Sequence, residues 1–141
     1  MNQSSRLEKW IWLSEAVSCG SVAAERLLEV FSDVEKVYEA SRENCKAAYP
    51  RLQNAALSRL SDKSTAGARE IIDNCAKKGI RIITRESREY PERLKNIPAA
   101  PIVLYARGEE LDIDSAAAIA IVGTRDASDY GEKPRAISGV R

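Results

Sequence analysis

Residues 118–125 read Ala118-Ile119-Ala120-Ile121-Val122-Gly123-Thr124-Arg125, an apolar run that passes directly into Gly-Thr-Arg. A short apolar run without polar alternation predicts a β-strand that is covered on both faces, as in a parallel sheet. Open α/β sheets bind their ligands just beyond the carboxyl ends of such strands. We therefore expect a binding site at Gly123, Thr124 and Arg125.

The turn after this predicted strand carries groups that suit a phosphate. Gly123 lets a ligand approach the main chain, Thr124 offers a hydroxyl group, and Arg125 offers a planar guanidinium. A turn signal at Ser128-Asp129-Tyr130-Gly131 begins a helix whose free N–H groups add a second anion site. The spacing matches neither a dinucleotide fingerprint nor a P-loop. From spacing alone, a phosphate site and a purely structural strand-to-helix turn are both open.

Length and composition are those of an ordinary globular protein. The chain has 141 residues, of which 44% are hydrophobic and 30% are charged, as in typical soluble domains. No apolar run is long enough to cross a bilayer, and the polar start at Met1–Arg6 is not a secretory signal. We therefore expect a cytoplasmic protein that does not contact a membrane.

Cysteine and histidine usage disfavours most metal and nucleophilic chemistry. Cys19, Cys45 and Cys75 are widely spaced, none belongs to a Cys-x-x-Cys pair, and the chain has no histidine. This pattern argues against zinc sites, a disulfide framework and any Ser-His or Cys-His mechanism. We expect buried or half-buried thiols, no metal and no other cofactor.

Charge is distributed unevenly along the chain. Residues 1–39 carry four basic and seven acidic side chains, and residues 86–141 carry eight basic and ten acidic. Residues 40–85 carry ten basic and four acidic side chains, a net charge of +6. This middle third suits either a nucleic-acid surface or a solvated helix face.

Apolar residues recur at helical spacing through the first eighty residues, which predicts a series of short helices. The predicted core stripes are Leu7, Trp10, Ile11, Ser14 and Val17; Ala23, Leu27, Val30 and Phe31; Val34, Val37 and Tyr38; and Ala68, Ile71, Ile72 and Cys75. The segment 41–60 is also predicted to be helical, with a break at Tyr49-Pro50. Ser32-Asp33-Val34-Glu35 matches a capping box, and Gly79 suits the left-handed residue after the last helix.

The break between the first two predicted helices, Cys19-Gly20-Ser21, resembles a helix-hairpin-helix turn, which presents backbone N–H groups to a phosphate. Such a turn needs a second glycine two residues before Gly20, where this chain has Ser18. The difference disfavours DNA binding by this turn.

The hydrophobic period changes near residue 80. Ile80–Thr84 is short and β-branched, which predicts a strand, and 102–105 is a second strand that follows Pro98 and Pro101. Tyr90-Pro91 indicates a turn between them, and 118–122 is the third predicted strand. The sequence therefore predicts a helical module followed by an α/β module.

The order of these motifs resembles the DNA-processing protein A family (DprA, also called Smf). The matching stretches are Tyr90-Pro91-Glu92-Arg93-Leu94, Ile97-Pro98, Pro101–Tyr105 with Gly108, Ile119–Arg125, and Tyr130-Gly131. The preceding helices resemble the sterile-alpha-motif-like (SAM-like) module of that family. The resemblance implies an α+β or α/β fold, with a helical SAM-like module at residues 1–80 and the start of a Rossmann-like domain at residues 81–141.

The resemblance also implies a function. The family is not known as an enzyme; it binds single-stranded DNA and helps to load a RecA-type recombinase during natural transformation. Carried over by position, Gly123, Thr124 and Arg125 contact phosphate, while Tyr130 and Gly131 shape the start of the next helix. Phosphate contacts of this kind carry affinity without sequence specificity.

Two features of the chain lead to further expectations. Pro134 lies where the family has a long helix, and Arg141 ends the sequence sixteen residues after Arg125. We therefore expect a truncated Rossmann-like domain with impaired activity, without the RecA contact region and with self-association undecided. Two alternatives are a nucleotide-binding enzyme of the phosphoribohydrolase kind, and a helical module without DNA activity whose strands at 102–105 and 118–122 are unpaired edges.

Overall fold

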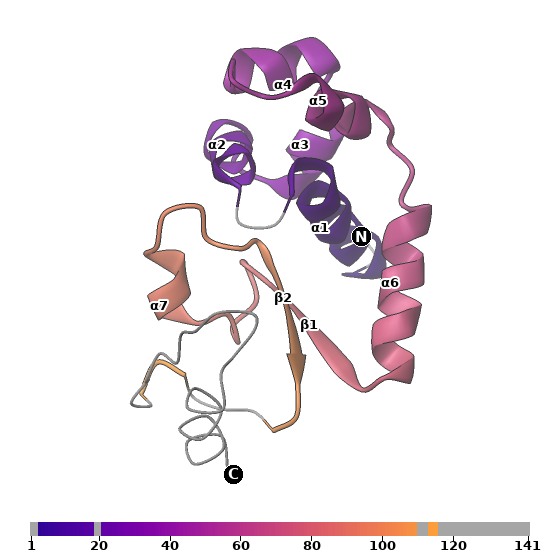
Figure 1. The fold of residues 1–141 in the computed structure, drawn as a ribbon, viewed down its shortest axis with the longest axis vertical. Helices are drawn as coiled ribbons and strands as arrows, with labels where there is room; N and C mark the ends of the chain where they lie inside the picture. Colours follow the sequence, from indigo (N-terminus) through magenta and orange to yellow (C-terminus); the bar gives the residue numbers. More distant parts are fainter. Residues whose placement is uncertain (1–2, 19–20, 110–112, 116–141) are drawn as a thin grey trace, which may run out of the picture. The chain divides into compact units, whose positions relative to one another are not determined.

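A computed structural model describes residues 3–18, 21–109 and 113–115 of the chain. By its internal contacts the chain divides into residues 1–110 and residues 111–141. The first unit holds every helix and strand described below (Figure 1). The predicted strand at 118–122 lies outside the described residues.

The described elements are mostly helical, with two strands near the end of the first unit. In chain order they are α1 (Gln3–Val17), α2 (Val22–Phe31), α3 (Val34–Glu39), α4 (Arg42–Ala48), α5 (Asn54–Ser61), α6 (Ala66–Lys77), β1 (Ile80–Thr84), α7 (Glu92–Lys95) and β2 (Val103–Arg107). The helices predicted within the first eighty residues and the first two predicted strands are confirmed. The helix predicted to begin near Ser128–Gly131 lies outside the described residues. The fold is a mixed α+β arrangement with a small antiparallel sheet.

Helix α1 lies at the centre of the core (Figure 1). It contacts α2, α3, α5, α6 and β2. Its second half is buried nearly all round: Trp10, Ile11, Trp12, Leu13, Ser14, Ala16 and Val17 are all buried. A helix with buried residues on every side must be covered by neighbours on every side, as an interior helix is. The surrounding elements therefore assemble around α1.

The turn between α2 and α3 differs from the predicted capping box. Ser32 has a φ of 63°, and its N–H donates to the Leu28 carbonyl oxygen (2.8 Å), so Ser32 ends α2. Asp33 adopts the extended backbone that an N-cap needs, and its carboxylate accepts from the Glu35 N–H (2.9 Å). The N-cap is therefore Asp33 and not Ser32. Aspartate caps a helix as well as serine does.

One other prediction from local pattern is also wrong. Val30 was expected in the core but is 58% exposed, because it lies in the last turn of α2 at the edge of the buried face. Tyr90-Pro91 was expected to begin a turn, and the structure adds a short helix that was not predicted, since Pro91 is the N-cap of the single-turn helix α7. Proline suits this position because its fixed φ (here −61°) is already compatible with a helix start.

Strands β1 and β2 pair antiparallel along their full lengths, from Ile80 opposite Arg107 to Thr84 opposite Val103. The Arg85 N–H donates to the Ile102 carbonyl oxygen (2.9 Å), which extends the ladder by one bond. The expectation that 102–105 is an unpaired edge is therefore wrong.

The small sheet shares the helical core. Ile102 and Val103 belong to the same buried cluster as the residues of α1, and α6 contacts β1. Residues 81–109 are thus packed against the helices in one unit. The predicted division into residues 1–80 and 81–141 stays a prediction, because most of the second segment lies outside the described residues.

Two glycines give a matched test of this backbone. Gly79 has a φ of +62° after α6, whereas Gly67 lies inside α6, and an added Cβ meets nothing within 4 Å at either position. We expect Gly79→Ala to lower the free energy of unfolding by about 1–2 kcal/mol, because an L-residue is strained at positive φ. We expect Gly67→Ala to raise it by about 0.5–1 kcal/mol through helix propensity. Urea denaturation measures both changes, and equal changes for the two variants would contradict the left-handed assignment.

Candidate nucleic-acid interface

The predicted phosphate site lies outside the described part of the chain. This holds for Gly123, Thr124 and Arg125 and for the helix start at Tyr130 and Gly131. Their roles stay predictions. The structure does describe the first half of the motif series, from β1 through Gly108, and the basic middle third.

The Tyr90-Pro91 motif lies in the connection from β1 to β2, where it has a structural role. Tyr90 is 2% exposed, and its hydroxyl donates to the Pro101 carbonyl oxygen (2.5 Å). Its own N–H donates to the Ser87 carbonyl oxygen (3.0 Å). The buried ring thus links the two motif stretches, Tyr90-Pro91 and Pro101–Tyr105, across eleven residues of chain.

A second set of bonds fixes the turn that follows β1. The Ser87 Oγ accepts from the Thr84 N–H (3.0 Å) and lies 2.9 Å from the Thr84 hydroxyl, while the Ser87 N–H donates to the Thr84 carbonyl oxygen (2.8 Å). Thr84 is buried, and these bonds satisfy its polar groups there. The turn is therefore held in one conformation, which sets the direction of Glu86 within it.

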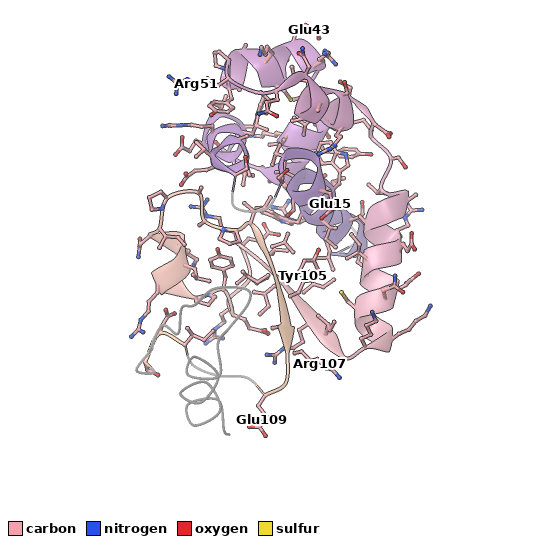
Figure 2. All side chains as sticks on the ribbon, in the orientation of Figure 1. Glu15, Glu43, Arg51, Tyr105, Arg107 and Glu109 are labelled. Carbon is pink, nitrogen blue, oxygen red and sulfur yellow. The ribbon has the colours of Figure 1, made fainter. Side chains whose placement is uncertain are left out.

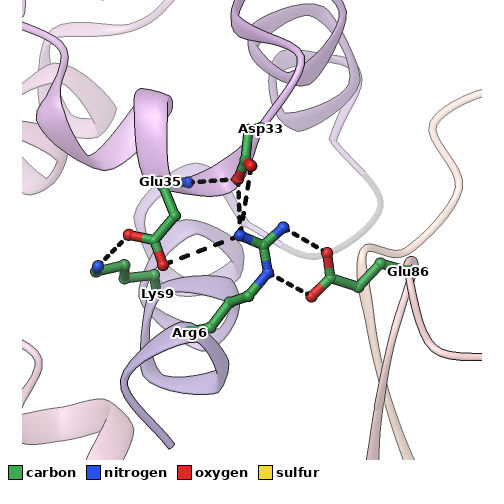
Figure 3. A network of polar contacts seen from close by, with 5 residues as sticks. All are labelled: Arg6, Lys9, Asp33, Glu35 and Glu86. Carbon is green, nitrogen blue, oxygen red and sulfur yellow. Dashed lines mark hydrogen bonds and ion pairs between the residues drawn. The ribbon is translucent and has the colours of Figure 1, made fainter. Parts of the chain in front are cut away.

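Arg6 joins that turn to the helices (Figure 3). Its guanidinium holds Glu86 by two parallel bonds, Nε to Oε1 (2.8 Å) and Nη2 to Oε2 (2.6 Å). Its remaining nitrogen, Nη1, donates to the Asp33 carboxylate (3.0 Å). Three segments, α1, the start of α3 and the turn after β1, thus meet at one side chain.

These bonds affect the carboxylates that accept them. The hydrogen bonds from Arg6 are the chief cause that lowers the pKa of Glu86. The pKa of Asp33 is lowered chiefly by the Glu35 backbone N–H, with Arg6 contributing. Lys9 pairs with Glu35 on the other side of the network (Figure 3). Sequence reasoning missed this network, because Arg6 and Glu86 are 80 residues apart and neither belongs to a motif.

A hollow of about 330 Å³ adjoins this network. Its charged lining consists of four carboxylates and two guanidinium groups, namely Glu25, Glu29, Asp33 and Glu86 with Arg6 and Arg85. Both arginines are within 4 Å of a carboxylate of that lining. An excess of negative charge repels phosphate, so this hollow is not a nucleic-acid site.

The basic middle third divides into engaged and solvent-facing side chains. Arg69 pairs with Glu8, and Arg85 lies near Glu25. Lys63 lies over the Trp12 ring (4.9 Å) and donates to the Ala40 carbonyl oxygen (3.2 Å). Lys46 is exposed and donates to the Leu52 carbonyl oxygen (2.9 Å). The exposed members that form neither an ion pair nor a side-chain hydrogen bond within the described residues are Arg42, Arg51, Arg59, Lys77 and Lys78.

The exposed cations lie in two places on the first unit. Three are on α4, α5 and the loop between them, where Figure 2 labels Arg51. Lys77 and Lys78 lie at the end of α6, just before β1. Half of the ten basic side chains of the middle third are therefore exposed without an ion pair or side-chain hydrogen bond in the described residues. This is compatible with a phosphate-binding surface and does not by itself require one.

The turn after α1 does not match a helix-hairpin-helix in its described residues. Ser18 has a φ of 72°, the conformation that the motif would give to glycine. The Ser21 hydroxyl caps α2 by accepting from the Ala23 N–H (3.1 Å). One of the N–H groups that a phosphate would need is thus already satisfied. Gly20 lies outside the described residues.

No group of three or more His, Cys, Asp or Glu side chains in the described ranges could hold a metal ion. Cys45 and Cys75 are buried free thiols, and burial raises the pKa of Cys45; Cys19 lies outside the described residues. No helix in the described part is long and apolar enough to span a membrane.

Comparison with known proteins points to one family. Residues 81–137 match the family model described as DNA recombination-mediator protein A. A segment of 55 residues is 40% identical to the DNA processing protein DprA of Bacillus subtilis (strain 168). This segment makes up 39% of this chain and 18% of that relative. No solved structure matches the chain. The resemblance drawn from the motifs is therefore confirmed over this segment.

The Arg6 network predicts how stability depends on pH. Because the folded-state pKa of Glu86 is lowered, its stabilisation is present above the ordinary carboxylate pKa and is lost as the pH falls through the lowered value. Arg6 and Glu86 are 30% and 41% exposed, so screening limits the pair to about 1 kcal/mol. We expect Glu86→Gln to lower the free energy of unfolding by about that amount at pH 7, and the difference from the unsubstituted chain to disappear as the pH falls below the lowered pKa of Glu86.

Urea denaturation at a series of pH values measures this difference. Glu89→Gln is the matched control, because Glu89 is exposed and forms no ion pair within the described residues. A loss for Glu86→Gln that persists unchanged at low pH would contradict the ionic role.

Proposed function

We propose that this chain is part of a non-enzymatic protein that binds single-stranded DNA, because residues 81–137 match the family model described as DNA recombination-mediator protein A. The observation that carries the proposal is the extent of the match. It runs from β1 and β2 through the predicted turn at Gly123-Thr124-Arg125. The residues of the predicted site lie within the matched segment.

The proposed contacts are to the DNA backbone. Gly123 lets the strand approach, the Thr124 hydroxyl and N–H donate to a phosphate oxygen, and the Arg125 guanidinium pairs with the phosphate charge. Tyr130 and Gly131 begin the following helix, whose free N–H groups face the same anion. Such contacts bind any sequence, as a protein that handles arbitrary DNA requires.

Two broader proposals follow from the family. One is that residues 1–80 form the SAM-like module and residues 81–141 the start of a Rossmann-like domain. The other is that the complete protein passes its strand to a RecA-type recombinase in recombination and transformation. The matched segment covers less than a fifth of the Bacillus subtilis relative.

The salt dependence of binding tests the phosphate site. The affinity for an oligo-dT strand is measured by fluorescence anisotropy from about 50 to 300 mM NaCl, a roughly sixfold range of salt concentration. We expect Arg125→Ala to weaken binding by about 1.5–3 kcal/mol, the value of a hydrogen bond to a charged group. The slope of log K against log salt should fall by about 0.7, which corresponds to one single-strand phosphate.

Arg26→Ala is the control, because it removes the same charge from α2, where Arg26 forms an exposed pair with Glu29 (2.8 Å). Equal losses for the two variants would indicate a non-local effect of net charge. Strong stabilisation of the chain by nucleoside monophosphates, with no DNA binding, would instead favour a nucleotide-binding enzyme.

A further inference from the structure

Strand β2 places one large aromatic side chain in solvent. Alternate residues of a strand share a face, so Val103, Tyr105 and Arg107 lie on the same side of the sheet. Val103 is buried, whereas Tyr105 is 48% exposed and Arg107 is also exposed. This face therefore runs from the core into solvent within three alternate positions, and Figure 2 labels the two exposed residues.

The neighbouring strand gives the tyrosine ring an apolar surround. Ile82 is the cross-strand partner of Tyr105, and Ile80 is the partner of Arg107. Cross-strand partners project to the same face, and both isoleucines are half-buried. We refer to Tyr105, Arg107, Ile80 and Ile82 as the β2 platform. It is an apolar surface with an aromatic ring on it and a cation at its end.

Two more cations adjoin the β2 platform. Lys77 and Lys78 end α6, and Lys78 precedes Ile80 by two residues, so their Cα atoms are at most about 7 Å apart. Both lysines and Arg107 are exposed and form no ion pair within the described residues. The acidic residues nearest to them in the sequence, Asp73 and Glu109, are not paired with them either. Within the described part of the chain, none of the three cations is thus neutralised by a carboxylate.

An exposed aromatic ring beside unpaired cations is the arrangement by which proteins hold single-stranded nucleic acid. Bases of a single strand stack on the ring, and the cations follow the sugar–phosphate chain. A duplex does not fit this arrangement, because its bases are already stacked on one another inside the helix. Stacking tolerates any base, in agreement with phosphate contacts that read no sequence.

We propose that the β2 platform is a second contact for single-stranded DNA, with one base stacked on Tyr105 and the adjoining phosphates on Arg107 and Lys78. This inference rests on the proposed function and adds a base contact to a phosphate site. It also assigns a DNA contact to a strand that precedes the Gly123-Thr124-Arg125 turn in the sequence.

The test compares two labelled strands, oligo-dT and the same strand with abasic positions throughout. Tyr105→Ala should weaken binding of oligo-dT by about five- to 150-fold, the range for losing one stacked base, and leave binding of the abasic strand unchanged. Tyr105→Phe keeps the ring and should bind both strands as the unsubstituted chain does. Arg107→Ala should weaken both strands and lower the salt slope by about 0.7.

Arg51→Ala is the charge-matched control, because Arg51 is also exposed and unpaired but lies in the α4–α5 loop, away from β2 (Figure 2). Thermal melting checks that each variant is folded. Tyr105→Leu, which keeps apolar volume without a ring, replaces Tyr105→Ala if the alanine variant unfolds.

Each outcome is decisive. Equal weakening of the oligo-dT and abasic strands by Tyr105→Ala would overturn base stacking, and equal effects of Arg51→Ala and Arg107→Ala would overturn a local cation site. If Tyr105→Ala binds oligo-dT normally while Arg125→Ala does not, the β2 platform is wrong and the proposed function stands. If the unsubstituted chain binds neither strand at low salt, both proposals are wrong.

Discussion

The burial of α1 is the constraint on which the rest of the first unit depends. Ile11 and Leu13 are fully buried, and Trp10 and Trp12 on neighbouring faces of the helix are nearly so. Burying such side chains stabilises the fold by about 1.5–3 kcal/mol each, but only if apolar neighbours cover every face of the helix. The other helices cover part of this surface, and Ile102 and Val103 belong to the same cluster. The strands are therefore part of the helical core and not an appendage to it.

Arg6 supplies the polar counterpart of that packing. Its fork can satisfy two carboxylates at once, and here these come from the α3 N-cap and the turn after β1. A cation paired with a single carboxylate would connect α1 to one element only. With Asp33 and Glu86 both bound, the orientation of the turn after β1 is linked to that of α1. Since the match to the recombination-mediator family begins at residue 81, this contact connects the helices to the family segment.

The sequence predicted most of the local structure and little of how the elements are joined. Helices such as α6 follow from apolar periodicity and a terminal Gly79, both of which are local signals. The predicted N-cap of α3 was wrong by one residue, because Ser32 and Asp33 are both good capping residues. Only the left-handed backbone of Ser32 decides between them. Helix α7 has four residues, too few to show any periodicity. The Arg6–Glu86 pair spans 80 residues, and no local pattern contains it.

In the candidate site, the sequence did not show which aromatic residues are buried. Tyr90 and Tyr105 both belong to the motif series that indicated the family, and the sequence alone gives them equal standing. The structure separates them: Tyr90 is buried with its hydroxyl bonded to the Pro101 carbonyl oxygen, whereas Tyr105 is half exposed on β2. A buried tyrosine with a satisfied hydroxyl is sufficiently explained by folding. The exposed ring of Tyr105 is not part of the core, and the proposed base contact would give it a role.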